Sequence, residues 1–247
     1  MTTTVTLDSL KSSDTALPNI VQSLSNQVLA DESKADDLVW ETWNSLFAVV
    51  AKTPREEQGR LVNFVDLLRK SPVKNAADQE VTVEGGALWA DLPTFGWVAR
   101  DLWNWDIHDP EATPEDHQDW DNKTAFLARL TSHADLSNDE DPLDFSIFGL
   151  WALRSAFEEN PESSTTNIPA VRNAALWIIY AGEALRKLAS EKKDMPGNSG
   201  VAGNRFPQKT WKGFNEERWN LWKAGFEAAA NSVDEAKEAA KIIQNLH

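Results

Sequence analysis

The segment Asn173–Gly182, NAALWIIYAG, is ten residues long and contains no charged side chain. It lies inside a longer helical pattern from about Pro169 to Lys192. A helix that is apolar on nearly every side is surrounded by other helices, because its side chains would otherwise face water. We therefore predict that this segment is the central helix of an all-α domain. Its predicted partner is the helix containing the equally apolar segment Phe145–Leu153, FSIFGLWAL.

Apolar residues at helical spacing recur along the rest of the chain. Helices are predicted to begin near residues 17, 34, 53, 93, 114, 142, 169, 210 and 232. Residues 71–91 interrupt this pattern. Val81-Thr82-Val83 alternates briefly there, but no partner strand is evident, so the segment is predicted to be an ordered loop. The fold class that follows is a single orthogonal helical bundle of about eight or nine helices with no significant sheet.

Residues 1–16, MTTTVTLDSLKSSDTA, are predicted to be a disordered arm and residues 17–247 a single all-helical domain. The arm lacks the apolar core of a signal peptide. The longest apolar runs are near ten residues, against about 20 needed to span a bilayer. These features predict an intracellular, cytoplasmic protein. The absence of cysteine excludes disulfides, thiolate metal sites and cysteine nucleophiles.

Charge is unevenly distributed along the chain. The net charge is −15, and residues 101–144 contain 13 acidic and only two basic residues. Residues 186–247 instead contain 11 basic and eight acidic residues. Nucleic acids and anionic membranes bind clustered Lys and Arg, so the balance argues against both as partners. It favours a protein partner with a basic surface, and it leaves self-association open.

The polar residues set into the two most apolar helices are the candidate site: Arg154, Tyr180 and Glu183. Arg154 follows Trp151 by three residues, and Glu183 follows Tyr180 by three, so each shares a helix face with an aromatic residue. In this hypothesis Arg154 holds an anionic or carbonyl group of a ligand, Glu183 is its counter-charge, and tryptophans such as Trp151 and Trp177 form the walls.

A structural interpretation of the same residues competes with the ligand site. Glu183 can pair with Lys187, and Arg154 with Glu158, at i+4 spacing, where each pair contributes only about 0.2–0.5 kcal/mol. A third alternative is a bridge between Arg154 and Glu183 that fixes the register of the two helices.

Two further groups of residues contain side chains found in metal sites or in nucleic-acid-binding surfaces. Residues 108–117 hold two histidines and four acids, but their order is not a recognised ligand spacing, so no metal site and no cofactor are predicted. Trp211, Trp219 and Trp222 alternate with basic residues, which is a pattern found in nucleic-acid binding. Trp at helical spacing is more often core, and we predict core here. The loop 194–208 is long enough to be either functional or disordered.

Four segments also carry a resemblance: WDNKTAFLARL from Trp120, LWALRSAFE from Leu150, WIIYAGEAL from Trp177 and GFNEERWNLWKAGF from Gly213. In this order they resemble a fungal all-helical domain family of unknown function, over roughly residues 35–230. The resemblance implies a helical fold and a fungal source. It implies no reaction, because the family has no established one.

Two functional hypotheses follow, and the sequence leaves open whether the protein is an enzyme. The first is a non-enzymatic protein-interaction or scaffold module that uses the acidic surface around residues 101–144. The second is a small-molecule-binding or catalytic pocket lined by tryptophan, with Arg154, Tyr180 and Glu183 as its polar groups. The pocket hypothesis requires a cavity of about 300 Å³ or more into which those groups point.

Overall fold

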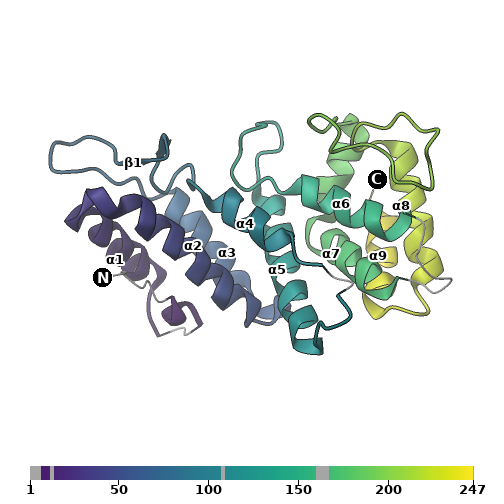
Figure 1. Ribbon diagram of the computed structural model, residues 1–247, viewed down its shortest axis with the longest axis horizontal. Coiled ribbons are helices and arrows are strands. Elements are labelled where there is room, and N and C mark those ends of the chain that lie inside the picture. The colour runs from purple at the N-terminus through teal and green to yellow at the C-terminus, as the bar shows by residue number, and fades with distance from the viewer. Residues whose placement is uncertain (1–6, 12–13, 107–108, 160–166, 247) are drawn as a thin grey trace. The chain divides into compact units, whose positions relative to one another are not determined.

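The computed structural model describes residues 7–11, 14–106, 109–159 and 167–246. Contacts between residues divide the chain into two compact units, residues 1–106 and 107–247, here called the N-terminal and C-terminal units. The described residues form nine α-helices and one very small β-hairpin, which confirms the predicted all-α class (Figure 1). The assignment of residues 17–247 to one domain stays a prediction.

The N-terminal unit contains four α-helices and short connecting elements. In chain order these are the 3-10 helix η1 (Asp8–Lys11), α1 (Leu17–Ala30), η2 (Glu32–Lys34), α2 (Ala35–Ala51), η3 (Arg55–Glu57), α3 (Gly59–Arg69), the strands β1 (Thr82–Val83) and β2 (Gly86–Ala87), and α4 (Phe95–Trp103). Helix α1 packs against α3, and α2 packs against α4.

Four aromatic side chains form the centre of this unit's core. The ring of Trp43 meets Trp89 edge-on at 5.8 Å and Phe95 at 5.1 Å, and Phe47 stacks on Phe95 at 5.4 Å. Such contacts add about 0.5–1.5 kcal/mol each beyond the area they bury. Aromatic side chains therefore contribute much of the packing in this core.

Both indole N–H groups in that core have a neutral acceptor. Trp43 Nε1 donates to the Pro93 carbonyl at 2.7 Å, and Trp89 Nε1 donates to Ser25 Oγ at 3.0 Å. The residues on either side of Pro93 are strained, because Leu92 and Thr94 have φ angles of 44° and 63°. The turn before α4 is thus held in an unfavourable conformation by the packing around it.

Two local predictions for this unit were wrong. Val83 does have a partner strand: β1 pairs with β2 in antiparallel register across the turn formed by Glu84 and Gly85. The partner contains Gly86, a residue with low β-propensity, which is why the pattern did not reveal it. Residues 8–11, which lie in the arm predicted to be disordered, form η1, in which Leu10 is buried.

Arg60 explains why part of the predicted arm is ordered. Its guanidinium donates to the carbonyls of Leu10 and Thr15, which ties residues before α1 to α3. Residues 1–6 and 12–13 of the predicted arm lie outside the described residues.

The C-terminal unit contains the other five α-helices: α5 (Pro114–His133), α6 (Ser146–Phe157), α7 (Ile168–Glu191), α8 (Glu216–Ala229) and α9 (Asp234–Asn245). Helix α7 contacts each of the other four (Figure 1). Within it, residues 173–178 and 181–182 are buried. This confirms that NAALWIIYAG is the central helix of its unit.

The close packing of α6 on α7 depends on Gly149. A Cβ atom at this position would lie 2.9 Å from Cε3 of Trp177, which is closer than side-chain carbons approach in folded proteins. The missing side chain leaves room for the fully buried Trp177 indole. The two segments paired from the sequence are therefore partners in the structure.

The predicted helix from Thr210 starts later than the apolar pattern suggests. Helix α8 begins at Glu216, after Asn215, whose side chain accepts a hydrogen bond from the Arg218 N–H at 2.9 Å. Residues 212–214 instead pair with residues 193–195, because Met195 N donates to the Lys212 carbonyl and Phe214 N to the Lys193 carbonyl. This segment therefore forms backbone hydrogen bonds with a distant segment instead of the helix that its apolar spacing predicts.

Among the helices described, none combines the length and the apolar character that crossing a membrane would need.

Candidate functional site

A groove runs along the side of α7 in the C-terminal unit. It has a volume of about 570 Å³ and lies between the end of α5, the middle of α7 and the end of α9. Its apolar part includes Ile178 and Ala181 of α7 with Ile242 and Leu246 from the end of the chain. The polar groups around it are Ser132, Asp135, Tyr180, Glu183 and Lys187.

Small residues on α7 create this groove. Gly182 lies at its base, and a Cβ atom there would lie only 3.0 Å from Cδ1 of Leu246. Ala181 and Ala184 flank it on the same helix. Short side chains in the middle of α7 therefore leave a hollow where larger ones would have filled the space against α9.

The side chain of Glu183 is exposed at the groove and forms no hydrogen bond or ion pair with any residue that the structure describes. The predicted i+4 pair with Lys187 is wrong. Lys187 Nζ lies 3.9 Å from Glu191 instead, one turn further along α7. The carboxylate of Glu183 is thus available to a group from outside the chain.

Asp135 is the second carboxylate of the groove. The hydroxyl and backbone N–H of Ser137 donate to it, and these bonds, together with the charge of Lys187, lower its pKa below the ordinary value. Asp135 is therefore ionised at neutral pH. With Glu183 and Lys187, it gives the groove a net negative rim.

Tyr180 is held in place at the groove by a basic residue. The guanidinium carbon of Arg129 lies 4.0 Å from the centre of the Tyr180 ring, which is cation–π geometry. Such a contact contributes about 0.5–2 kcal/mol and restricts the ring. Tyr180 therefore presents a fixed, half-buried surface.

The other three candidate residues lie elsewhere in the unit. Trp177 is fully buried beside Gly149. Trp151 is half-buried and donates from Nε1 to the Ser199 carbonyl at 2.9 Å. Arg154 Nε lies 3.6 Å from Oε1 of Glu159. The structure thus brings Tyr180 and Glu183 to one groove without Arg154.

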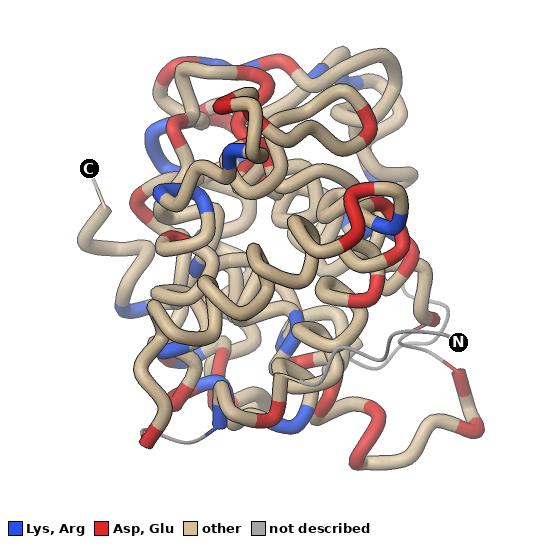
Figure 2. The backbone as a smooth tube through the Cα atoms, turned by 90° about the vertical axis from the view of Figure 1, so that its left-hand side faces the viewer, with Lys and Arg blue, Asp and Glu red and all other residues tan. Residues whose placement is uncertain are grey.

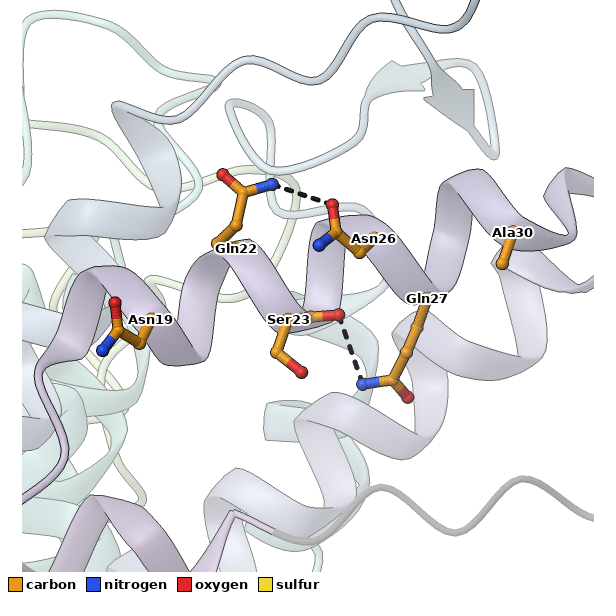
Figure 3. A pocket seen from close by; sticks show the side chains of 6 residues that line it. All are labelled: Asn19, Gln22, Ser23, Asn26, Gln27 and Ala30. Atoms are coloured by element: carbon orange, nitrogen blue, oxygen red, sulfur yellow. Dashed lines mark hydrogen bonds between the residues drawn. The ribbon is translucent and has the colours of Figure 1, made fainter.

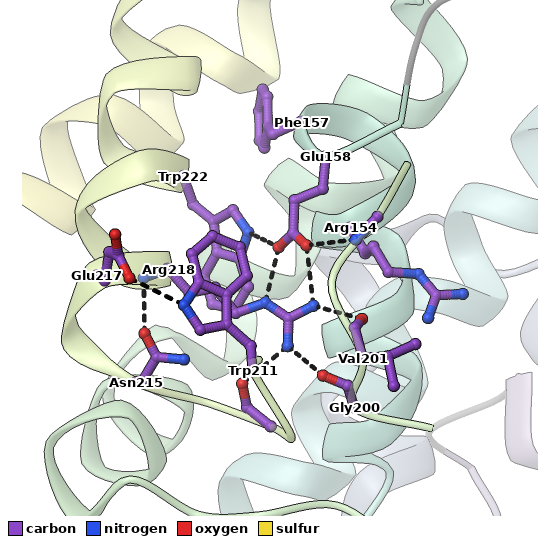
Figure 4. Close-up of polar contacts among 12 residues, drawn as sticks. Arg154, Phe157, Glu158, Gly200, Val201, Trp211, Asn215, Glu217, Arg218 and Trp222 are labelled. Atoms are coloured by element: carbon purple, nitrogen blue, oxygen red, sulfur yellow. Dashed lines mark hydrogen bonds and ion pairs between the residues drawn. The ribbon is translucent and has the colours of Figure 1, made fainter. Parts of the chain in front are cut away.

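The predicted pair of Arg154 with Glu158 is also wrong, because Glu158 has a partner distant in sequence (Figure 4). Arg218 forms a bidentate ion pair with Glu158, with Nε–Oε1 and Nη2–Oε2 distances of 2.9 Å, and both side chains are completely buried. Trp222 Nε1 donates to the same carboxylate at 2.9 Å. The sequence reasoning missed this pair.

The remaining donors of Arg218 hold the long loop. They reach the carbonyls of Gly200, Gly213 and Val201 at 2.6, 2.8 and 3.0 Å, so all five N–H groups of the guanidinium are used. Glu158 in turn accepts from Gly203 N at 3.1 Å. The loop 194–208 is therefore ordered by a buried ion pair.

One sequence signal could have indicated the pair. Glu158 and Arg218 both stand inside the segments that carried the family resemblance, LWALRSAFE and GFNEERWNLWKAGF. Helical spacing instead predicted ion pairs between residues four apart on the same helix. Since α6 ends at Phe157, Glu158 lies beyond the helix and turns toward α8.

Acidic residues outnumber basic residues by 39 to 24 in the sequence, and red exceeds blue along the backbone in Figure 2. Part of the predicted acidic surface has a structural role. Asp116 forms a capping box with Thr113 at the start of α5. Asp141 is buried and accepts from Leu143 N at 2.9 Å, and Asp144 accepts from Ser146 N at 2.8 Å. These carboxylates accept hydrogen bonds at the start of α5 and in the segment between α5 and α6.

Among the residues that the structure describes, no group of three or more His, Asp or Glu side chains is arranged to hold a metal ion. His108, part of the histidine- and acid-rich segment 108–117, lies outside the described residues. Of the three tryptophans predicted to be core, Trp219 and Trp222 of α8 are buried, whereas Trp211 lies before the helix and is only half-buried.

The described helices, with their tryptophan-rich cores, define an all-α protein. Residues 43–226, more than half of the chain, match the family described as "Protein of unknown function (DUF3632)", and the chain belongs to this family. The match lies within the limits predicted from the resemblance. A search of curated proteins and a search of solved structures each found no match to the chain. A fungal source and an intracellular location stay predictions.

Proposed function

We propose that this protein is a helical protein-interaction module whose C-terminal unit binds a basic, partly apolar segment of a partner in the groove between α5, α7 and α9. The observation that carries the proposal is the exposed Glu183, which has no partner among the described residues, beside an apolar hollow of about 570 Å³. A segment with one apolar anchor and a nearby Lys or Arg matches both features.

Charge around the groove supports a basic partner. Asp135 lies on the same rim, and Glu140 is exposed five residues further along the chain. Asp139 forms an ion pair with Lys193, so it contributes less to the negative charge around the groove. Complementary charge of this kind increases the rate of encounter and selects the partner, while the apolar contact provides most of the affinity.

Selection of a random peptide library on the full-length protein tests the proposal. We expect enriched peptides to combine Lys or Arg with Leu, Ile or Phe, and their affinity to fall with added salt. Glu183→Lys should weaken the best peptide about tenfold by placing like charge at the rim. The matched control is Glu238→Lys, which makes the same charge change at an exposed position on α9 that does not line the groove.

A groove-filling variant separates the apolar from the charged contribution. Ala184→Trp should abolish peptide binding, whereas Ser190→Trp, on the exposed side of the same helix, should leave it unchanged. Equal loss with Glu183→Lys and Glu238→Lys would contradict the proposal, because binding would then depend only on net charge.

A second candidate function uses the same groove for a small molecule. Its volume lies in the range of about 300–1,000 Å³ typical of ligand pockets, and Arg129 holds Tyr180 in a fixed orientation. Native mass spectrometry of the protein purified from its source tests this alternative. A retained small molecule that is lost in Ala184→Trp would favour it over a peptide partner.

A further inference from the structure

Helix α1 of the N-terminal unit has a neutral surface, unlike the other helices. The chain is 26% charged, yet the 14 residues of α1, LPNIVQSLSNQVLA, include no Asp, Glu, Lys or Arg. Every other α-helix in the described ranges contains at least one charged residue. The exposed face of α1 is therefore uncharged in a protein of net charge −15.

The exposed face of α1 consists mainly of amide and small side chains, together with Leu29, which is 38% exposed. Asn19, Gln22, Ser23, Asn26, Gln27 and Ala30 line it at spacings of three and one along the helix (Figure 3). The opposite face buries Ile20, Val21, Leu24 and Val28. The amide stripe thus extends over most of the helix, a length of about 20 Å at 1.5 Å per residue.

The amide groups of the stripe use only part of their hydrogen-bonding capacity within α1. Gln22 Nε2 donates to Asn26 Oδ1 at 2.8 Å, and Gln27 Nε2 donates to the Ser23 carbonyl at 3.3 Å (Figure 3). Each amide has two N–H donors and a carbonyl acceptor, so further donors and acceptors face outward. The side-chain amide of Asn19 has no hydrogen-bond partner among the described residues, although its backbone N–H donates to the Ala16 carbonyl at 3.0 Å.

We propose that α1 is a self-association surface, on which a second copy of this chain packs its own α1 in antiparallel orientation. A two-fold contact places identical surfaces against each other, so it must be self-complementary. Amides meet this condition because each is both donor and acceptor, whereas a surface of one charge repels its copy. Charge depletion is also the compositional feature of interface centres.

The second copy is favoured over another partner by the charge of the rest of the molecule. Two chains of net charge −15 repel one another, and they approach most closely where both surfaces are neutral. A single pair of helices buries less area than a stable dimer requires, so the association is expected to be weak and concentration-dependent.

Because the chain contains no cysteine, a single introduced cysteine tests the geometry directly. Ser23 lies at the middle of α1, so an antiparallel pair brings it close to its own copy. Under mild oxidation, Ser23→Cys should form a disulfide-linked dimer at least about ten times faster than Asn63→Cys, an exposed position on α3 of the same unit. Equal rates for the two variants would overturn the proposal.

Sedimentation velocity of the full chain gives an independent test. The wild-type protein should shift toward dimer as concentration rises, Ser23→Glu should abolish the shift, and Asn63→Glu should retain it. Added salt should preserve or strengthen the dimer because it screens repulsion between copies, the opposite of its effect on a basic peptide in the groove. A wild-type monomer at all concentrations, or a dimer abolished by Glu183→Lys instead, would overturn the proposal.

Discussion

The two units bury their polar groups in different ways. In the N-terminal unit, Trp43 and Trp89 donate to neutral acceptors, a backbone carbonyl and a hydroxyl. In the C-terminal unit, Arg218 and Glu158 form a charged pair with no exposed surface, surrounded by Trp222 and loop carbonyls. Both cores contain aromatic rings, but only the C-terminal core also contains a fully buried ion pair among the described residues.

The difference follows from what each unit has to hold. The turn around Pro93 is short, and one indole hydrogen bond and close aromatic packing accompany it. The segment between α7 and α8 is long and has many backbone carbonyls to satisfy. A guanidinium with five donors can satisfy several of them at once, and a carboxylate then has to balance its charge.

The largest expected effect is in the C-terminal unit. Arg218→Met leaves the Glu158 carboxylate buried without its counter-charge, which should lower the free energy of unfolding by about 3–5 kcal/mol. Urea unfolding measures it. Arg186→Met is the matched control, since Arg186 pairs at 2.7 Å with the half-exposed Glu216 and should cost only about 0–1 kcal/mol. Similar losses for the two variants would mean that complete burial does not raise the cost of breaking the Arg218–Glu158 pair.

The double variant sharpens the same comparison. Adding Glu158→Leu to Arg218→Met removes the stranded charge, so part of the lost stability should return. The Gly203 N–H and the Trp222 indole N–H lose their acceptor in this variant, so recovery should be incomplete. No recovery would mean that the two side chains act separately.

An intermediate effect is expected in the N-terminal unit. Trp43→Phe removes the donor to the Pro93 carbonyl and should cost about 1–3 kcal/mol of unfolding free energy, less than loss of the buried charge. Trp97→Phe serves as control, because Trp97 is 59% exposed and should change stability by less than about 0.5 kcal/mol. If Trp43→Phe lowered the free energy of unfolding by more than Arg218→Met does, the expected order of the two effects would be wrong.

The smallest effect concerns Glu217, an exposed residue in the first turn of α8. Hydrogen bonds from Lys209 and the Trp211 indole lower the pKa of its carboxyl below the ordinary value. These contacts therefore stabilise the fold above that ordinary pKa and are lost as pH falls through the lowered one. Carbon-detected NMR titration should show the pKa of Glu217 rising in Lys209→Gln. An unchanged pKa would contradict this contact.

Much of the helical architecture could be predicted from sequence. Patterns with many apolar residues at a constant spacing, such as Trp43, Leu46 and Val50, gave correct helices because their burial depends on local geometry alone. The start of α8 was predicted wrongly, since Trp211 and Phe214 continue the helical pattern but the backbone of residues 212–214 pairs with residues 193–195. Long-range backbone pairing leaves no periodic signal.

The candidate site was predictable only in part. Tyr180 and Glu183 both reach the groove, but Arg154 contacts Glu159 and Trp177 is packed behind Gly149. At about 100° per residue, Glu183 lies roughly 120° around the helix from Trp177, so the two cannot face one pocket. The sequence showed that Trp177 and Glu183 lie close together on one helix. The direction in which each side chain leaves the helix determines whether it is buried in the core or reaches the groove.

The sequence by itself determined that this is an all-α protein with a central apolar helix, because the period of hydrophobic residues is a local property of the chain. Only the tertiary structure decided that Glu158 pairs with Arg218, 60 residues away, and that Glu183 has no described partner. Charged side chains are long and can pair with many alternatives. Which of them meet depends on how the helices and loops pack, which no local pattern encodes.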